Sequence, residues 1–370
     1  MSISAVLIFL VILLVLVIIH EFGHFIVAKW TNMRVDEFAF GFPPRIYRKK
    51  LGETTYSLNA LPIGGYVSIW GENGSEEDNA SDGAKNNPRA FGNRPWWAQI
   101  LVLLAGVTMN MLLALIILVC LSFGKVEMSA DDPTYGSRVE DTSLVVLDAY
   151  PESPAYKAGL TPGSRLISVT SKNMKASLVT ATSLVTFIEN HSNDAITFVY
   201  EKQNGEHAST TVAAIYGIVP NKKAVGISVG TTGYVYTSTG EAIKLGLQRT
   251  KDITLLTFGG LKTLLVSAIH RDGSVLNSLS GPIGIAKIVG ETSAYGIMPI
   301  LTLVAILSIN LAVFNILPLP ALDGGRIIMV VIESISRRKI PFKYYSWLNL
   351  GGFALLLLLL VVVTVHDVIK

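Results

Sequence analysis

Four long stretches of the chain are almost free of polar residues. They run from about Ile3 to Ala28, from Trp97 to Phe123, within Thr292 to Leu322, and from Tyr344 to Val365. Crossing a bilayer as a helix takes about 20 predominantly apolar residues. Each stretch is long enough, so the pattern predicts an α-helical integral membrane protein with four transmembrane helices.

The third stretch predicts an irregular span. It carries no charge for 31 residues, but it contains Pro299, Asn310, Asn315, Pro318 and Pro320. Proline removes a backbone donor and kinks or ends a helix. We therefore expect this span to be broken or kinked.

A fifth apolar stretch, Ile253 to Ile269, is weaker. It has only 17 residues, and Gly259, Gly260 and the charged Lys262 lie inside it. The preceding segment GEAIKLGLQRTKD is amphipathic, as in helices that lie in the membrane interface. We predict that the two segments form a pair of helices lying on the interface or dipping into it, within an interfacial region 238–290.

The segment 125–237 has the pattern of a folded β-rich domain. Its β-branched runs SLVVLDA, AITFVYE and STTVAAIYG are separated by turn signals such as Asn204-Gly205. We expect this domain to be inserted between the second span and the interfacial helices.

A shorter β-pattern lies between Thr54 and Gly71, which carries no charge over 18 residues. Pro62, Gly64 and Gly65 make it a poor membrane span, and β-branched and aromatic residues lie on both sides of these three. The pattern predicts a β-hairpin over about residues 53–72.

The composition agrees with a membrane protein that carries a modest soluble part. Of 370 residues, 50% are hydrophobic and 15% are charged, and the mean hydropathy is +0.49; soluble chains carry about 25% charged residues. The net charge of +3 is small and no basic patch with interleaved aromatics is present, which argues against a nucleic-acid partner. The single cysteine, Cys120, excludes an intramolecular disulfide framework. The first apolar stretch lacks the charged n-region of a signal peptide, so we expect it to be retained.

Charges between the spans predict the orientation. The connection 29–95 carries nine Lys or Arg and eight Asp or Glu, and it ends in the polar segment GENGSEEDNASDGAKNNP, which we expect to be mobile. The connection 326–343 carries five Lys or Arg against Glu333 alone. Short loops rich in Lys and Arg stay in the cytoplasm. Both connections are therefore predicted to be cytoplasmic, with both termini and the β-rich domain outside.

Three polar residues interrupt the apolar pattern of the first span. His20 and His24 are separated by four positions, so on a helix they project from neighbouring turns of one face. Two such histidines can share a metal ion, and Glu21 between them can accept a proton from a water. Ionisable groups inside a span are functional candidates by default. The pattern HEFGH therefore indicates a zinc site.

Asp323 is the candidate for a third ligand. It ends the charge-free run of the third span, and it is the only acid between Glu291 and Glu333. If 253–269 does not cross the membrane, the third span returns Asp323 to the depth of the histidine pair. The alternative is that Asp323 caps a helix or marks the membrane edge.

The motifs HEFGH and NILPLPALDGG resemble the site-2 protease family of intramembrane zinc metalloproteases. GETTYSLNALPIGGYVSIWGE, AFGNRPWWAQILVLLAG with the following MN, and SGPIGIAKIV are similar to its bacterial branch, which includes the regulator of sigma E protease. These motifs touch most of the chain. The resemblance implies Zn²⁺ as cofactor, His20, His24 and Asp323 as its ligands, and Glu21 as the catalytic acid and base.

The resemblance also implies how a substrate binds. It makes Asn315 a substrate-orienting residue near the metal. It favours a hairpin that re-enters the membrane beside the metal, with Asn59, Gly64 and Gly65 as substrate-binding candidates; an ordinary cytoplasmic hairpin is the alternative. An extended peptide can pair with a free strand edge.

Some motifs depart from the family pattern. The family's GFGP is GFPP at 41–44, and its AGPxxN is AGVTMN at 105–110. The segment YPESPAYKAGLTPGSRLISVTSKNM resembles a PDZ domain, but Ser164-Arg165 replaces the usual Gly-Asp. We expect one PDZ domain that binds a peptide terminus or obstructs bulky substrates.

Together these features predict an N-terminal membrane half (1–124), an extracytoplasmic PDZ domain (125–237), interfacial helices (238–290) and a C-terminal membrane half (291–370). The expected function is cleavage of single-span membrane proteins within the bilayer of a bacterial inner membrane, with anti-sigma factors or remnant signal peptides as substrates. An inactive scaffold that uses its PDZ domain is a rival, against which the intact Glu21 argues. A transporter is a weaker rival, because no paired repeat is present.

Overall fold

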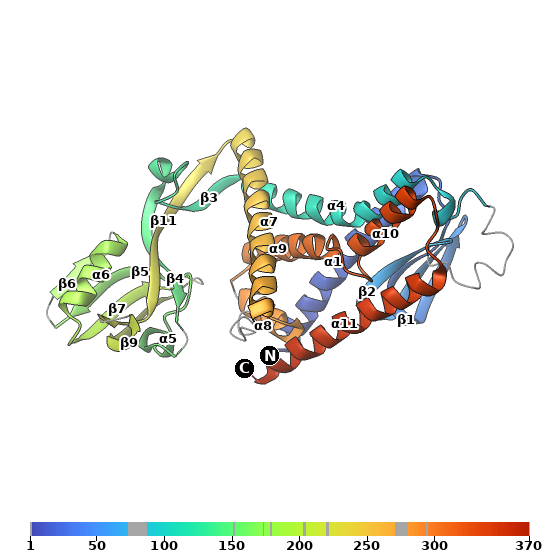
Figure 1. Ribbon diagram of the computed structural model, residues 1–370. Helices are drawn as coiled ribbons and strands as arrows, with labels where there is room; N and C mark the ends of the chain where they lie inside the picture. The colour runs from blue at the N-terminus through green and yellow to red at the C-terminus, as the bar shows by residue number, and fades with distance from the viewer. Residues whose placement is uncertain are drawn as a thin grey trace. The chain divides into compact units, whose positions relative to one another are not determined.

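A computed structural model describes residues 2–72, 87–150, 152–172, 174–177, 180–202, 205–219, 222–270, 280–293 and 295–369. Contacts divide the chain into two compact units, one formed by Met1–Leu121 with Lys244–Lys370 and the other by Ser122–Ile243 (Figure 1). Asn204 and most of the polar segment that we expected to be mobile lie outside the described residues.

Four helices of the described residues are long and apolar enough to cross a membrane, which confirms the prediction of four spans. They are α1 (Ile3–Trp30), α4 (Trp96–Cys120), α9 (Ile297–Asn315) and α11 (Phe342–Ile369). The helix α4 contacts both α1 and α9. Small residues at these contacts, such as Ala114 and Ala305, are fully buried and allow the close approach that helix packing in lipid requires.

The third span is broken, as its prolines predicted. The helix α9 ends at Asn315, a turn containing Pro318 and Pro320 follows, and α10 (Asp323–Ser336) begins. Gly324 and Gly325 fit this turn because a Cβ on either would overlap a carbonyl oxygen of residues 316–319. The glycines therefore allow the start of α10 to pack directly on the preceding turn.

The predicted pair of interfacial helices is wrong in one respect. A single helix, α7 (Thr239–His270), joins both segments, and a shorter α8 (Pro282–Ser293) follows. Ile253 and Leu261 of α7 pack on the apolar cluster of α4 and α9, and Thr257 Oγ1 donates a 2.8 Å hydrogen bond to Asn310 Oδ1. These contacts lie on both sides of the Gly259-Gly260 pair, which explains why the helix continues through it.

The strands β1 (Val35–Leu51) and β2 (Thr54–Ile69) form a bent antiparallel sheet. The register gives Glu37 two partners, Ser68 and Thr55, and Phe40 likewise two, Gly65 and Leu58. The predicted hairpin is therefore wrong in its pairing: the halves of β2 do not pair with each other, because the first part of β1 lies between them. Phe25 of α1 contacts Phe38 and Tyr56 of this sheet, with ring centroids 5.3 and 6.0 Å apart.

The strand segment 65–69 forms one edge of the β1–β2 sheet. Residues 65–69 pair with residues 35–40 on one side, and no strand pairs with their other side among the described residues. The sheet packs on α1 through a buried cluster that includes Val35, Ile69 and Ala28.

The unit Ser122–Ile243 is built on a seven-stranded sheet. Its strand order is β3 (Gly124–Ser129), β11 (Ile227–Thr237), β4 (Glu140–Ala149), β5 (Arg165–Ser171), β7 (Ala195–Glu201) and β8 (His207–Ala213), with β6 (Met174–Ser177) paired to β5. The other elements are α5 (Pro154–Lys157), α6 (Ala181–Asn190), β9 (Ile215–Val219) and β10 (Lys222–Ala224). Buried residues such as Leu144, Leu184 and Phe198 give the unit its own core. This confirms a β-rich region inserted between membrane helices.

Candidate metal centre

The helix α1 places His20 and His24 on one face, as their spacing predicted. Their Nε2 atoms lie 3.1 Å apart, and the residues are only 7% and 8% exposed. Because each imidazole is buried within an apolar helix, each needs a polar partner.

Asp323 meets this pair from the start of α10. Its Oδ2 lies 3.1 Å from Nε2 of His20 and 3.5 Å from Nε2 of His24. One ligand atom from each of the three residues lies within 4.8 Å of the others. The structure thus brings together the three residues that the sequence proposed as ligands, although 299 positions separate His24 from Asp323.

A backbone carbonyl fixes the state of His24. Its Nδ1 lies 2.8 Å from the carbonyl oxygen of Val102 in α4. A carbonyl can only accept, so Nδ1 carries the proton and donates it. The lone pair of the neutral ring is then on Nε2, the atom that faces His20 and Asp323.

Asn110 of α4 lies beside Nδ1 of His20, as the Val102 carbonyl lies beside Nδ1 of His24. It is fully buried, and its amide nitrogen lies 3.4 Å from Nδ1 of His20. Its Oδ1 is buried and has no hydrogen-bond partner among the described residues. The oxygen and nitrogen of an amide group have nearly the same shape. If these two atoms of Asn110 exchange places, Oδ1 can accept a hydrogen bond from a protonated Nδ1 of His20. His20 Nε2 would then be a free electron-pair donor, as in His24.

Glycine lets α4 come this close to α1. A Cβ on Gly106 would overlap Nε2 of His24 and would lie 2.6 Å from Cε1 of His20. One turn further along, Ser308 of α9 donates a 2.8 Å hydrogen bond to the carbonyl oxygen of Asn110. The sequence motif contained Gly106 and Asn110, but its pattern gave no role to either.

Comparison with known proteins agrees with this geometry. The sequence pattern of peptidase family M50 matches residues 8–359 of the chain. The chain belongs to this family. A protein of Fusobacterium nucleatum described as a candidate zinc metalloprotease is 34% identical over 365 residues, which cover 98% of each chain. One of Clostridium perfringens with the same description is 32% identical over 361 residues, or 96% of this chain and 95% of the relative. The regulator of sigma-W protease RasP of Bacillus subtilis is 27% identical over 444 aligned positions, which cover 100% of this chain and 99% of the relative.

As a member of family M50, the protein is a zinc metalloprotease of the site-2 protease type and a multi-pass membrane protein. The candidate metal site fits zinc on three grounds. Two imidazoles and a carboxylate are common zinc donors. Oδ2 of Asp323 is buried, yet it forms no hydrogen bond with any described group. His24 presents its unprotonated Nε2 to the same point.

Asp323 also has the charge that this site needs. Two neutral imidazoles leave a bound Zn²⁺ with its full double charge, and the carboxyl group of Asp323 can supply the anion that this charge needs.

Glu21 lies on α1 beside the edge of the β1–β2 sheet. Its Cγ lies 3.7 Å from the position that a Cβ on Gly65 would take. A side chain at Gly65 would also meet the carbonyl oxygen of Ala39 at 2.8 Å. The glycine thus keeps the edge strand close to the acid.

The other predicted substrate-binding residues have different surroundings. The Asn315 amide nitrogen lies 3.3 Å from Nε2 of His20, so this residue is at the metal centre. Gly64 packs against the Phe42 ring, and Asn59 donates a 2.9 Å hydrogen bond to the carbonyl oxygen of Gly41. The Asn59 amide nitrogen therefore stabilises the sheet itself.

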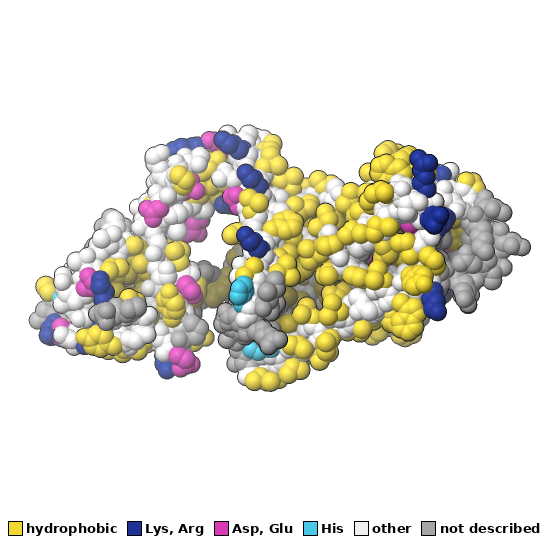
Figure 2. Space-filling model, in the orientation of Figure 1, with side chains coloured by type: hydrophobic (Ala, Val, Ile, Leu, Met, Phe, Trp, Pro, Cys, Tyr) yellow, Lys and Arg dark blue, Asp and Glu magenta, His cyan; other side chains and the backbone are white. Residues whose placement is uncertain are grey.

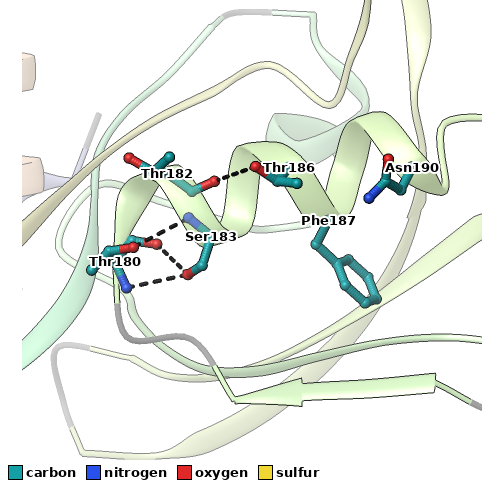
Figure 3. A pocket seen from close by; sticks show the side chains of 6 residues that line it. All are labelled: Thr180, Thr182, Ser183, Thr186, Phe187 and Asn190. Carbon is teal, nitrogen blue, oxygen red and sulfur yellow. Dashed lines mark hydrogen bonds between the residues drawn. The ribbon is translucent and has the colours of Figure 1, made fainter.

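The unit Ser122–Ile243 has a hollow of its own, of about 490 Å³, on α6 (Figure 3). Three of its polar side chains bond to their own helix: Thr180 and Ser183 form a reciprocal cap, and Thr186 donates to the carbonyl oxygen of Thr182 at 3.0 Å. The Phe187 ring is the apolar part of its lining.

Proposed function

We propose that this protein cleaves peptide bonds inside the transmembrane segments of single-span membrane proteins. One observation carries the proposal: two of the three candidate zinc ligands and Glu21 are on α1, a helix apolar enough to span a membrane. A metal centre on such an apolar helix is not expected in a soluble protease, because polar groups within a membrane-spanning helix are costly and are found where function requires them.

In this proposal His20, His24 and Asp323 hold the zinc ion. A zinc ion held there supplies Lewis acidity, which makes a water more acidic and polarises a carbonyl oxygen. Glu21 accepts the proton of the attacking water at its carboxylate and later donates it to the departing amine. The Val102 carbonyl and the Asn110 amide keep the two imidazoles in the orientation and tautomer that binding needs.

The edge strand 65–69 is the proposed site for the substrate backbone. A helix must unwind before its peptide bonds can be attacked, and an unwound segment can pair with a free edge. Gly65 brings this edge beside Glu21, and Asn315 can orient the substrate at the metal centre. Non-helical backbone at membrane depth is tolerated where protein surrounds it, so we propose that the sheet re-enters the membrane here.

We propose a PDZ fold for residues 125–237, with the hollow on α6 as the place where a peptide end would bind. The relative in Bacillus subtilis is named a regulator of sigma-W protease. Anti-sigma factors trimmed outside the cell are therefore the substrates we propose first, and remnant signal peptides second.

Replacing Glu21 with Gln tests the catalytic role. The variant Glu21→Gln should keep one zinc per chain and lose cleavage of a tagged single-span substrate by roughly 10²- to 10⁴-fold, because the ligands remain and the proton acceptor is gone. Glu291→Gln is the matched control, since this exposed acid at the end of α8 is not among the candidate metal ligands. Wild-type turnover by Glu21→Gln would refute the mechanism.

The orientation can be tested by labelling with an impermeant thiol reagent. In a Cys120→Ala background, a cysteine at Lys49 or Arg338 should be protected in intact cells, and one at Thr182 should react. Labelling at Arg338 from outside would show that the proposed orientation is inverted.

A further inference from the structure

A hollow at the end of α10 lies apart from the residues of the metal centre. It has a volume of about 300 Å³, and its lining comes from residues 92–99 at the start of α4 and residues 330–339 at the end of α10. Three consecutive cations, Arg337, Arg338 and Lys339, line it together with Trp96 and Gln99.

These cations have no acidic partner within the part of the chain that the structure describes. Lys339 donates to the neutral Oδ1 of Asn93 at 3.3 Å, and neither arginine forms an ion pair there. Glu333 is the only acid in the lining, and its Oε1 already accepts a 2.8 Å hydrogen bond from the backbone of Ile340. The hollow therefore has an excess of positive charge.

The backbone gathers these cations in one place. Arg337 ends α10 with φ of 53°, a left-handed conformation that glycine adopts far more readily. Ser336 stabilises the turn, because its Oγ donates to the carbonyl oxygen of Arg338 at 3.2 Å and lies 3.4 Å from the backbone nitrogen of the same residue. The left-handed turn at Arg337 ends the helix, and the three cations that line the hollow follow one another there.

The hollow lies where two membrane-spanning helices begin. Trp96 is the first residue of α4, and α11 begins at Phe342, three positions after Lys339. Trp96 and Trp97 are 54% and 50% exposed, as expected for tryptophans at a membrane interface. Side chains on the outer face of α10, including Ile332 and Ile335, are also exposed. Figure 2 shows dark-blue cationic side chains next to this apolar surface.

We propose that this hollow binds the phosphate-bearing headgroup of an anionic phospholipid. Arginine and lysine form strong charge-assisted hydrogen bonds with phosphate, and the exposed apolar face of α10 offers a surface for the acyl chains. The volume suits a headgroup and not a whole lipid. Cytoplasmic leaflets are rich in anionic lipids, which agrees with the orientation proposed for residues 326–343.

The test uses the full-length protein in a non-ionic detergent, with bound lipids counted by native mass spectrometry during titration with phosphatidylglycerol or phosphatidylcholine. The wild type should bind one phosphatidylglycerol saturably and prefer it by roughly tenfold or more. The triple variant R337Q/R338Q/K339Q should lose this preference, because it removes the hydrogen bonds to the charged phosphate. The matched control R48Q/K49Q/K50Q removes the same charge from an exposed part of β1 and should bind like the wild type.

Three results would overturn the proposal. The triple variant could bind phosphatidylglycerol like the wild type, or the control could lose binding equally, which would reveal an effect of net charge alone. Inorganic phosphate at millimolar concentration could displace the lipid completely, which would show a site for free phosphate. If the triple variant does not fold, Arg338→Gln and Arg338→Glu carry the test, with the greater loss expected for the acid.

Discussion

A single methyl group added at Gly106 perturbs the candidate metal centre without replacing any candidate ligand. At this glycine α4 passes the histidines of α1, and a Cβ would overlap Nε2 of His24 and lie 2.6 and 2.8 Å from Cε1 and Nδ1 of His20. Unstrained carbon contacts are about 3.5–4.0 Å. One or both rings must therefore move by roughly 1 Å in Gly106→Ala.

A displacement of this size exceeds the tolerance of about 0.5 Å for a preorganised site. We expect Gly106→Ala to lower zinc affinity by roughly 10- to 100-fold, the range seen when groups that orient metal ligands are disturbed, and to lower cleavage with it. Zinc per chain is measured by elemental mass spectrometry after dialysis against a graded series of chelator concentrations.

Gly351→Ala is the matched control. Gly351 is also a helical glycine in a membrane span, but a Cβ there would meet nothing within 4 Å. Both variants gain the same helix propensity, about 1 kcal/mol, so a difference between them reports the contact with the histidines. If Gly106→Ala retained zinc as tightly as Gly351→Ala, α4 could not lie as close to α1 as the structure shows.

Three further predictions test neighbouring parts of the protein. Asp323→Asn keeps the shape of the side chain and removes its charge, so zinc affinity and cleavage should both collapse. Asp323→Glu should restore them only in part. If Asp323→Asn still bound one zinc ion per chain tightly, Asp323 would be excluded as a ligand. Asn110→Asp keeps an acceptor for His20 Nδ1 and should bind zinc more tightly than Asn110→Leu, as measured by chelator competition, and equal affinities would refute the orienting role of Asn110. At the β1–β2 turn, hydrogen bonds from Arg89 and then Lys29 lower the pKa of Glu53 to about 2 from the usual 4.5. The ionised Glu53 therefore stabilises the fold fully above about pH 4.5, and this stabilisation is lost as the pH falls towards about 2. The thermal unfolding temperature of Glu53→Gln should differ from that of the wild type at neutral pH, and the two temperatures should converge near pH 2. A difference in unfolding temperature that stays constant with pH would contradict the ion pairs assigned to Glu53.

The spans and the grouping of the candidate histidine ligands could be predicted because each rests on a strong local signal. Charge-free runs of about 20 residues have few alternatives to a span, and the four-residue spacing of His20 and His24 places them together on any helix. Asp323 required one further step, the parity of membrane crossings. The structure puts the carboxylate beside both histidines, while the orientation in the membrane stays a prediction.

The features that sequence reasoning missed depend on contacts between distant segments. The first part of β1 lies between the halves of β2, and no local pattern within residues 54–71 predicts this pairing. The helix α7 continues through Gly259 and Gly260 because its neighbours on α4 and α9 hold it, which propensity cannot show. Gly106 and Asn110 look like ordinary small and polar residues of a span until α4 is placed against the histidines.

The separation of the ligands along the chain has a consequence for biosynthesis. His20 and His24 leave the ribosome early, but Asp323 comes 299 positions after His24, which at about 5–20 residues per second is a delay of roughly 15 to 60 seconds. During that interval the nascent chain has both candidate histidine ligands but lacks Asp323. A half-synthesised or prematurely terminated chain therefore cannot bring the three candidate ligands together, and the complete centre can form only after the last of them has been synthesised.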